Sequence, residues 1–145
     1  MKIPTREEIC ERLLRQGEAN DFVKEFDFVQ ELAFGVNIQN GWWEERNRIS
    51  SLCAEAGIEY DHHLAIELLG LVGTEISEAI EAARKHARST WGDHATKDTM
   101  VRECAGAIVR LMDLCGRFEL PLGQAILAEI EANSQRGHMH GGKKA

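Results

Sequence analysis

Apolar residues recur along most of this chain at every third or fourth position, the spacing that gathers them on one face of an α-helix. No segment shows the strict alternation that favours a β-strand. The pattern predicts six helices, at about 6–16, 21–34, 42–56, 61–86, 96–118 and 121–136. We therefore expect an all-α fold, a helical bundle.

Residues that start or stop helices support these boundaries. Thr5 and Glu8 have the spacing of a capping box, and Asp61 is suited to cap the long fourth helix. Gly57 is a plausible stop after the third helix. Two polar segments that contain glycine should be loops, 35–41 and 87–95.

The chain has 145 residues, 43% of them hydrophobic, which suits a single domain. We expect N-terminal helices over 1–40, a bundle over 41–136 and a mobile tail over 137–145. A net charge of −7 and a pI near 5.4 disfavour binding to a nucleic acid polymer or an anionic membrane. Long apolar runs, a signal peptide and closely spaced cysteines are all missing, so we expect a cytoplasmic protein with reduced thiols.

Two acidic residues occupy unusual positions on the helix predicted over 61–86. A helical wheel gives this helix one continuous apolar arc, made of Leu64, Leu68, Leu71, Val72, Ile76, Ala79, Ile80 and Ala83. Glu75 falls inside the arc, and Glu78 lies at its edge about 4.5 Å further along the axis. Because an isolated buried charge is costly, Glu75 must be protonated, paired or bound to a cation.

The helix predicted over 96–118 repeats this arrangement, with Glu103 beside its apolar arc. That arc consists of Met100, Cys104, Ala107, Ile108, Leu111 and Cys115. Acids bordering the core faces of two long helices indicate a site between them, and carboxylate oxygens suit Mg²⁺, with Mn²⁺ also possible. Alternatively, the acids lie on solvated faces or are neutralised by nearby arginines, for which the choices are Arg84, Arg102 and Arg110.

Several segments resemble one family when taken together. They are Gly-Trp-Trp-Glu-Glu-Arg at 41–46, Thr-Glu-Ile-Ser-Glu-Ala-Ile-Glu-Ala-Ala-Arg at 74–84, Glu103 ahead of Ile-Val-Arg-Leu-Met-Asp-Leu at 108–114, Leu-Gly-Gln-Ala-Ile at 122–126, Asn133, Arg136 and His-Gly-Gly-Lys at 140–143. In order and spacing they resemble the MazG-like nucleoside triphosphate pyrophosphohydrolases. The resemblance runs from residue 41 to the C-terminus, and the first forty residues carry no recognised motif.

The resemblance implies an all-α bundle of the NTP pyrophosphatase type that forms a homodimer or homotetramer. Such enzymes use Mg²⁺ to hydrolyse a nucleoside triphosphate to the monophosphate and pyrophosphate. By resemblance, Glu75, Glu78 and Glu103 would be the catalytic metal ligands. The expected substrate-binding residues divide into two groups, with Trp42 or Trp43 stacking on the base and Asn133, Arg136 and Lys143 holding phosphates.

Two residues depart from the family pattern. Gly106 stands where the second metal-binding motif has Asp, and Asp113 cannot replace that acid because it lies about 15 Å beyond Glu103 along the helix. Glu129 stands where many relatives have lysine and would repel phosphate. These departures motivate an alternative function, a catalytically impaired relative that serves as a nucleotide-binding or protein-interaction module.

Overall fold

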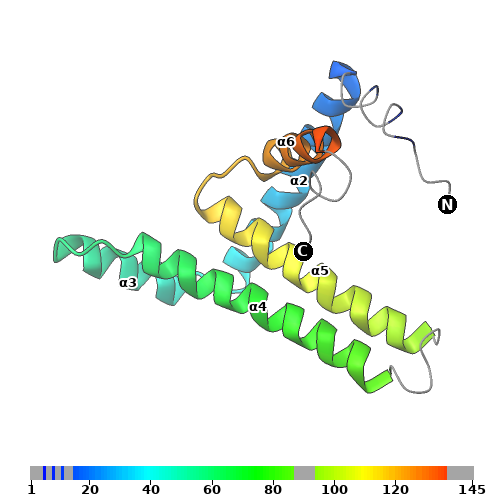
Figure 1. Cartoon of the computed structure of the whole chain (residues 1–145). Helices are drawn as coiled ribbons and strands as arrows, with labels where there is room; N and C mark the ends of the chain where they lie inside the picture. Colours follow the sequence, from blue (N-terminus) through cyan, green and yellow to red (C-terminus); the bar gives the residue numbers. More distant parts are fainter. Residues whose placement is uncertain (1–4, 6–7, 9–10, 12–14, 87–93, 137–145) are drawn as a thin grey trace. The chain divides into compact units, whose positions relative to one another are not determined.

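The computed structural model describes residues 5, 8, 11, 15–86 and 94–136. This part of the chain is helical and contains no strand, which confirms the predicted all-α class. Its long helices are α2 (Gln16–Gln39), α3 (Glu44–Glu55), α4 (Asp61–His86), α5 (His94–Arg117) and α6 (Leu122–Gln135) (Figure 1). None of the described helices has the length and apolar character needed to cross a membrane.

The chain divides into two compact units, and the single domain expected from the sequence stays a prediction. One unit combines Met1–Val29 with Pro121–Ala145, and the other is Gln30–Leu120. The larger unit contains the end of α2 together with α3, α4 and α5, and it carries Glu75, Glu78 and Glu103.

The predicted boundaries hold best for α4, which spans 61–86 as expected. The prediction for α2 was wrong, because the helix continues through Gly35 to Gln39. One glycine inside a helix costs only about 1 kcal/mol, which is too little by itself to end a helix of this length. The capping box is confirmed: the Thr5 N–H donates to Glu8 Oε2 at 2.7 Å and the Glu8 N–H donates to Thr5 Oγ1 at 3.2 Å. The rest of the helix predicted over 6–16 lies mainly outside the described residues.

Three helices end in the same hydrogen-bonded turn, with one residue in the left-handed conformation. Gly41 ends α2 with a φ of 78°, and Gly57 ends α3 with a φ of 70°, as the sequence predicts for Gly57. Glu119 takes this position after α5 with a φ of 53°, a conformation that glycine adopts more easily. In each turn the following N–H donates to a carbonyl five residues back, at 2.8–3.1 Å. These turns stop the helices without side-chain caps.

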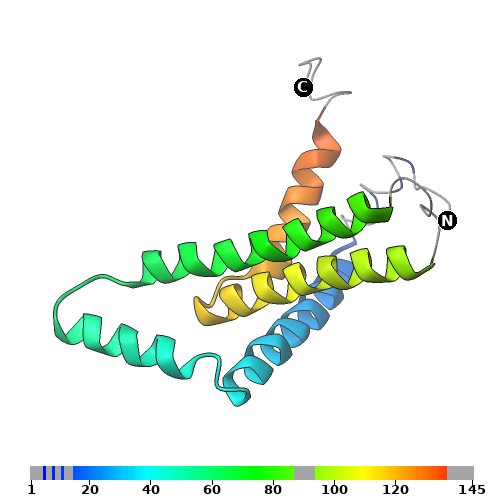
Figure 2. The same ribbon diagram turned by 90° about the horizontal axis from the view of Figure 1, so that it is seen from below.

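The core of the Gln30–Leu120 unit forms around α4 and α5, which run antiparallel and side by side in both views (Figures 1 and 2). Its buried apolar residues are Trp43, Leu64, Leu68, Ala79, Ala82, Ala107, Met112, Leu114 and Cys115. Phe34 of α2 packs onto α5 at Gly116, where an added Cβ would lie 2.8 Å from the Phe34 Cβ. A side chain at position 116 would therefore push α2 and α5 apart.

Part of the arc predicted to be core is open to solvent. On α4, Ile76 and Ile80 are 44% and 55% exposed, and on α5 Cys104 and Ile108 are exposed too. This corrects the wheel-based expectation: each of the two helices covers only one side of its partner's apolar arc. On α4 the exposed side continues through Ile66 and Leu69. We call these four α4 residues, Ile66, Leu69, Ile76 and Ile80, the apolar strip.

The smaller unit pairs the start of α2 with α6. Gly123 is buried there, and a Cβ at this position would lie 3.3 Å from the Phe26 Cβ, so its missing side chain permits close packing. Phe22 stacks near Phe26, with ring centroids 5.6 Å apart. Phe22 and Phe26 of α2 thus contribute to packing in this unit.

Candidate functional site

Three acids converge between α4 and α5. One carboxylate oxygen from each of Glu75, Glu78 and Glu103 lies within 4.8 Å of the other two. The Glu75 and Glu103 side chains are only 14% and 15% exposed, while Glu78 is open to solvent. The predicted meeting of acids from two helices is therefore present, and Glu75 lies away from open solvent.

Glu75 contacts both Arg110 and the backbone of α5. Arg110 Nε donates to Glu75 Oε1 at 2.6 Å, and the other oxygen, Oε2, faces Gly106. A Cβ on Gly106 would lie 2.5 Å from Oε2, which is closer than non-bonded atoms approach. The glycine that replaces an expected metal-binding acid thus leaves the space that the Glu75 carboxylate occupies.

Arginine also neutralises part of the charge on Glu103. Arg102 donates to Glu103 Oε1 at 3.2 and 3.4 Å, but the Arg102 side chain is 76% exposed, so this pair contributes little to stability. Of the three arginines named as alternatives, Arg110 and Arg102 pair with cluster acids, whereas Arg84 pairs with Glu81. These two ion pairs therefore neutralise part of the negative charge of the cluster.

The spacing of the carboxylates suits a small divalent cation. Magnesium binds oxygen at about 2.1 Å, so two ligands on opposite sides of one ion are about 4.2 Å apart. The three oxygens, all within 4.8 Å, need to move by less than 1 Å to share one ion. Long glutamate side chains can make that adjustment by rotation. Glu75, Glu78 and Glu103 therefore fit a Mg²⁺ or Mn²⁺ site.

A pocket of about 230 Å³ adjoins the cluster at Glu75 and Gly106. Side chains from the end of α2, the turn after it, α3, α4 and α5 line the pocket: Asn37, Trp42, Arg46, Leu68, Leu71, Glu75, Val109, Arg110 and Asp113. Its walls combine apolar side chains with a few charged and amide groups, the usual composition of a small-molecule site.

The two adjacent tryptophans have different environments. Trp42 is 58% exposed and lines the pocket, so its ring is accessible to a ligand. Trp43 is 2% exposed, contacts Phe34 edge to face and donates from Nε1 to Asp113 Oδ1 at 3.0 Å. The prediction of base stacking is therefore retained for Trp42, and burial in the core rules it out for Trp43.

Asp113 is the pocket residue that the sequence did not identify. It continues a polar edge of α5 in the helical pattern, yet only 9% of it is exposed. Burial raises the pKa of the Asp113 carboxyl, while hydrogen bonds from Trp43 and Asn37 and the charges of Arg46 and Arg110 act to lower it. Asp113 lies three residues after Arg110 and one turn before Arg117. This position gave no sign in the sequence that its side chain would be buried.

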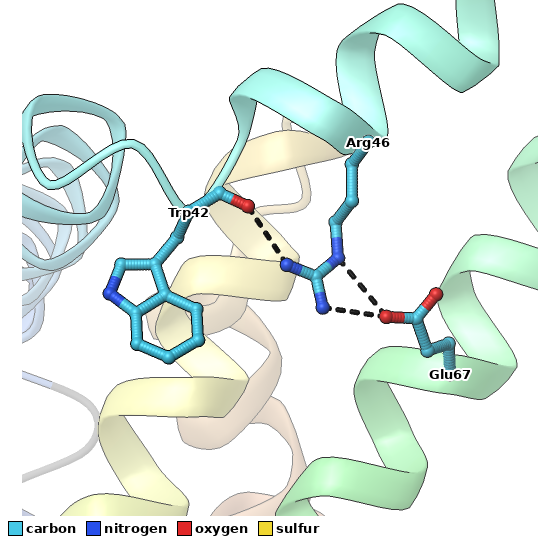
Figure 3. Close-up of polar contacts among 3 residues, drawn as sticks. All are labelled: Trp42, Arg46 and Glu67. Carbon is cyan, nitrogen blue, oxygen red and sulfur yellow. Dashed lines mark hydrogen bonds and ion pairs between the residues drawn. The ribbon is translucent and has the colours of Figure 1, made fainter.

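Arg46 connects the pocket wall to α4. It donates from Nη1 to the Trp42 carbonyl at 2.9 Å and from Nη2 to Glu67 Oε1 at 2.6 Å (Figure 3). Its guanidinium also lies 5.8 Å from the centroid of the Trp43 ring. These contacts fix α3 against α4 and hold the backbone of Trp42, leaving the Trp42 indole free to face a ligand.

The predicted phosphate-binding residues lie elsewhere in the chain. Asn133 donates to Glu129 at 3.0 Å and Arg136 pairs with the same carboxylate at 3.5 Å, all on or just after α6 in the smaller unit. Glu129 therefore contacts both of these residues, and its expected repulsion of phosphate stays a prediction. Lys143 lies outside the described residues.

No family model, curated protein or solved structure matches the chain.

Proposed function

We propose that this protein is a Mg²⁺-dependent nucleoside triphosphate pyrophosphohydrolase. The observation that carries the proposal is the convergence of Glu75, Glu78 and Glu103 at the end of a pocket containing an exposed tryptophan. Carboxylates that converge in this way favour a positive charge between them, which a divalent metal ion would supply, and the same ion would bind the phosphates of a nucleotide. The order of the sequence motifs agrees with this chemistry.

Each part of the site has a separate role in the proposed reaction. The three glutamates would hold the metal, and Trp42 would stack on the base. When bound, the divalent ion would neutralise phosphate charge and lower the pKa of an attacking water. Arg110, which is 36% exposed, can turn from Glu75 toward a phosphate oxygen, because a guanidinium binds either anion through the same donors.

Pyrophosphate release from a panel of nucleoside triphosphates tests the proposal. The purified protein is incubated with each triphosphate and Mg²⁺ or Mn²⁺, and the monophosphate and pyrophosphate are separated by ion-exchange chromatography. Equal amounts of the two products are expected from at least one nucleotide, and chelation of the metal should abolish them. If a folded sample releases no pyrophosphate from any nucleotide, the protein is not this enzyme.

A nucleotide-binding protein without turnover is the second candidate function. The ion pair between Glu75 and Arg110 and the absence of an acid at Gly106 favour it.

The variant Gly106→Asp distinguishes the two functions. The new acid forces the flexible end of Glu75 aside and adds a fourth carboxylate, so Mn²⁺ affinity by calorimetry should rise by on the order of tenfold. A gain in hydrolysis would indicate a site limited by the missing acid. Gly106→Asn is the control, because it adds the same bulk without charge and should not tighten metal binding.

We also propose that a second copy of this chain covers the apolar strip of α4. Four large apolar side chains, 44–65% exposed, follow one face of the helix, and contiguous patches of this kind mark interfaces. Light scattering should give a dimer or tetramer for the native chain and a smaller mass for Ile66→Lys. Ile58→Lys alters a similarly exposed residue outside α4 and should leave the mass unchanged. A monomeric native chain would contradict the proposal.

A further inference from the structure

The pocket beside the acid cluster has two chemically different ends. Glu75 and Gly106 form the end next to the cluster, and Asp113 lies seven residues further along α5, about 10 Å by helical rise. Between them, Leu68 and Val109 supply apolar wall. A ligand with a flat apolar body and a charged group at a distance would match this division.

Asp113 has hydrogen-bonding capacity that the protein does not fill. A carboxylate offers about four acceptor sites. Trp43 Nε1 occupies one on Oδ1, and the side chain of Asn37 contacts the same carboxylate. The two arginines of the pocket bind elsewhere, Arg46 to Glu67 and Arg110 to Glu75, and no ion pair to Asp113 occurs among the described residues. This buried carboxylate can therefore accept further N–H groups from a ligand.

We propose that this pocket binds a nucleobase that carries an exocyclic amino group and that Asp113 accepts a hydrogen bond from that group. Trp42 covers one face of the base, since its ring is 58% exposed at the pocket. Cytosine and adenine carry such an amino group at the position where uracil, thymine and hypoxanthine carry a carbonyl oxygen, which would place two acceptors against each other. Guanine carries its amino group at C2.

This inference rests on the proposed function for the identity of the ligand as a nucleotide, and it names the class of base. The sugar would bridge the distance between Asp113 and the carboxylate cluster, with the phosphates reaching Glu75. Binding sites built to hydrogen-bond an N–H strongly reject analogues without it, because their own polar group is left buried and unpaired. Base preference is therefore set by Asp113 and hydrolysis by the glutamates.

Binding of free nucleosides tests the assignment without metal or phosphate. Cytidine is compared with uridine, and adenosine with inosine, since each pair exchanges an amino group for a carbonyl. Nuclear magnetic resonance of the labelled full chain follows the Trp43 Nε1–H signal, because this group donates directly to Asp113. We expect the amino-bearing nucleoside of each pair to bind at least about tenfold more tightly and to shift this signal. Equal affinities within both pairs, or no binding of any nucleoside, would overturn the inference.

The variant Asp113→Asn should reverse the preference. Asparagine keeps an oxygen that can accept from Trp43 while replacing the other acceptor with an N–H donor. Uridine and inosine should then bind better than cytidine and adenosine. Asp98→Asn makes the same chemical change at an exposed position of α5 outside the pocket and should leave the preference unaltered. If a folded Asp113→Asn protein still prefers the amino-bearing nucleosides, the inference is also overturned. If the variant does not fold, the comparison of nucleoside pairs on the wild-type chain decides the inference.

The outcome for base selection is separable from that for hydrolysis. Amino-selective nucleoside binding without pyrophosphate release from any triphosphate would contradict only the proposed enzyme. Pyrophosphate release with equal binding of both members of each nucleoside pair would contradict only the role of Asp113.

Discussion

Replacing Glu75 by glutamine is expected to slow pyrophosphate release by on the order of 10²–10³-fold. The substitution keeps the size of the side chain but removes the negative charge that the cluster needs to hold a divalent ion. Because Glu75 is the most enclosed of the three acids, at 14% exposure, solvent cannot easily replace its oxygen at the metal. Initial rates at saturating nucleotide and metal measure the effect.

A second readout separates metal binding from a purely structural role. Glu75 also accepts a hydrogen bond from Arg110 at 2.6 Å, so its loss can destabilise the fold without involving a metal. If Glu75 is a metal ligand, Glu75→Gln should raise the Mn²⁺ concentration needed for half-maximal activity. A lower melting temperature with unchanged metal dependence would instead support an ion pair alone.

Glu81→Gln provides the matched control on the same helix. Glu81 pairs with Arg84 outside the cluster, so its substitution should change activity less than about twofold, as surface changes usually do. Full activity in Glu75→Gln, measured beside this control, would remove Glu75 from the proposed site.

Truncating Trp43 to alanine should lower the free energy of unfolding by about 3–5 kcal/mol, a large share of the stability of a typical domain. The ring is 2% exposed and contacts Phe34 edge to face. Its loss also removes one of the two hydrogen-bond donors to the buried Asp113 carboxylate, Trp43 and Asn37, which adds to the cost of the cavity. Urea denaturation monitored by circular dichroism measures the change.

Trp42→Ala is the natural comparison, because it removes the same side chain one position earlier. Trp42 is 58% exposed, so its truncation should cost about 0.5 kcal/mol or less while weakening any ligand that stacks on it. Similar losses of stability for both variants would contradict the division of the pair into a core residue and a ligand-facing residue.

Helical periodicity was enough to predict the acid cluster. Glu75 inside the apolar arc of one long helix, with Glu78 at its edge, and Glu103 beside the arc of the next long helix indicated a site between the two helices. Periodicity does not determine which arginine pairs with which acid, because that depends on the rotation of one helix against the other. The choice of Arg110 for Glu75 could only be seen in the structure.

Asp113 and Trp43 show why the rest of the site could not be predicted. A wheel describes α5 about its own axis, and there Asp113 belongs to a polar edge. Its burial comes from Trp43, a residue seventy positions earlier, which covers that edge and donates a hydrogen bond to it. Contacts between distant segments of this kind leave no periodic trace in either segment.

The end of α2 shows the limits of composition as a guide to boundaries. Gly35 was read as the start of a loop, but the helix passes through it and ends only at Gln39, ahead of the left-handed Gly41. Both residues are glycine, and the difference lies in their backbone conformations: Gly35 lies within the helix, whereas Gly41 takes a φ of 78° and allows the chain to turn toward Trp42.

That turn also determines how rigid the mouth of the pocket is. The Trp42 N–H donates to the Asn37 carbonyl at 3.1 Å across Gly41, so two residues whose side chains line the pocket are joined through the main chain. Because this hydrogen bond already orders the turn, ligand binding would cost little additional conformational entropy of the protein. Because Gly41 has a φ of 78°, a residue with a side chain at position 41 would strain this turn and should weaken ligand binding.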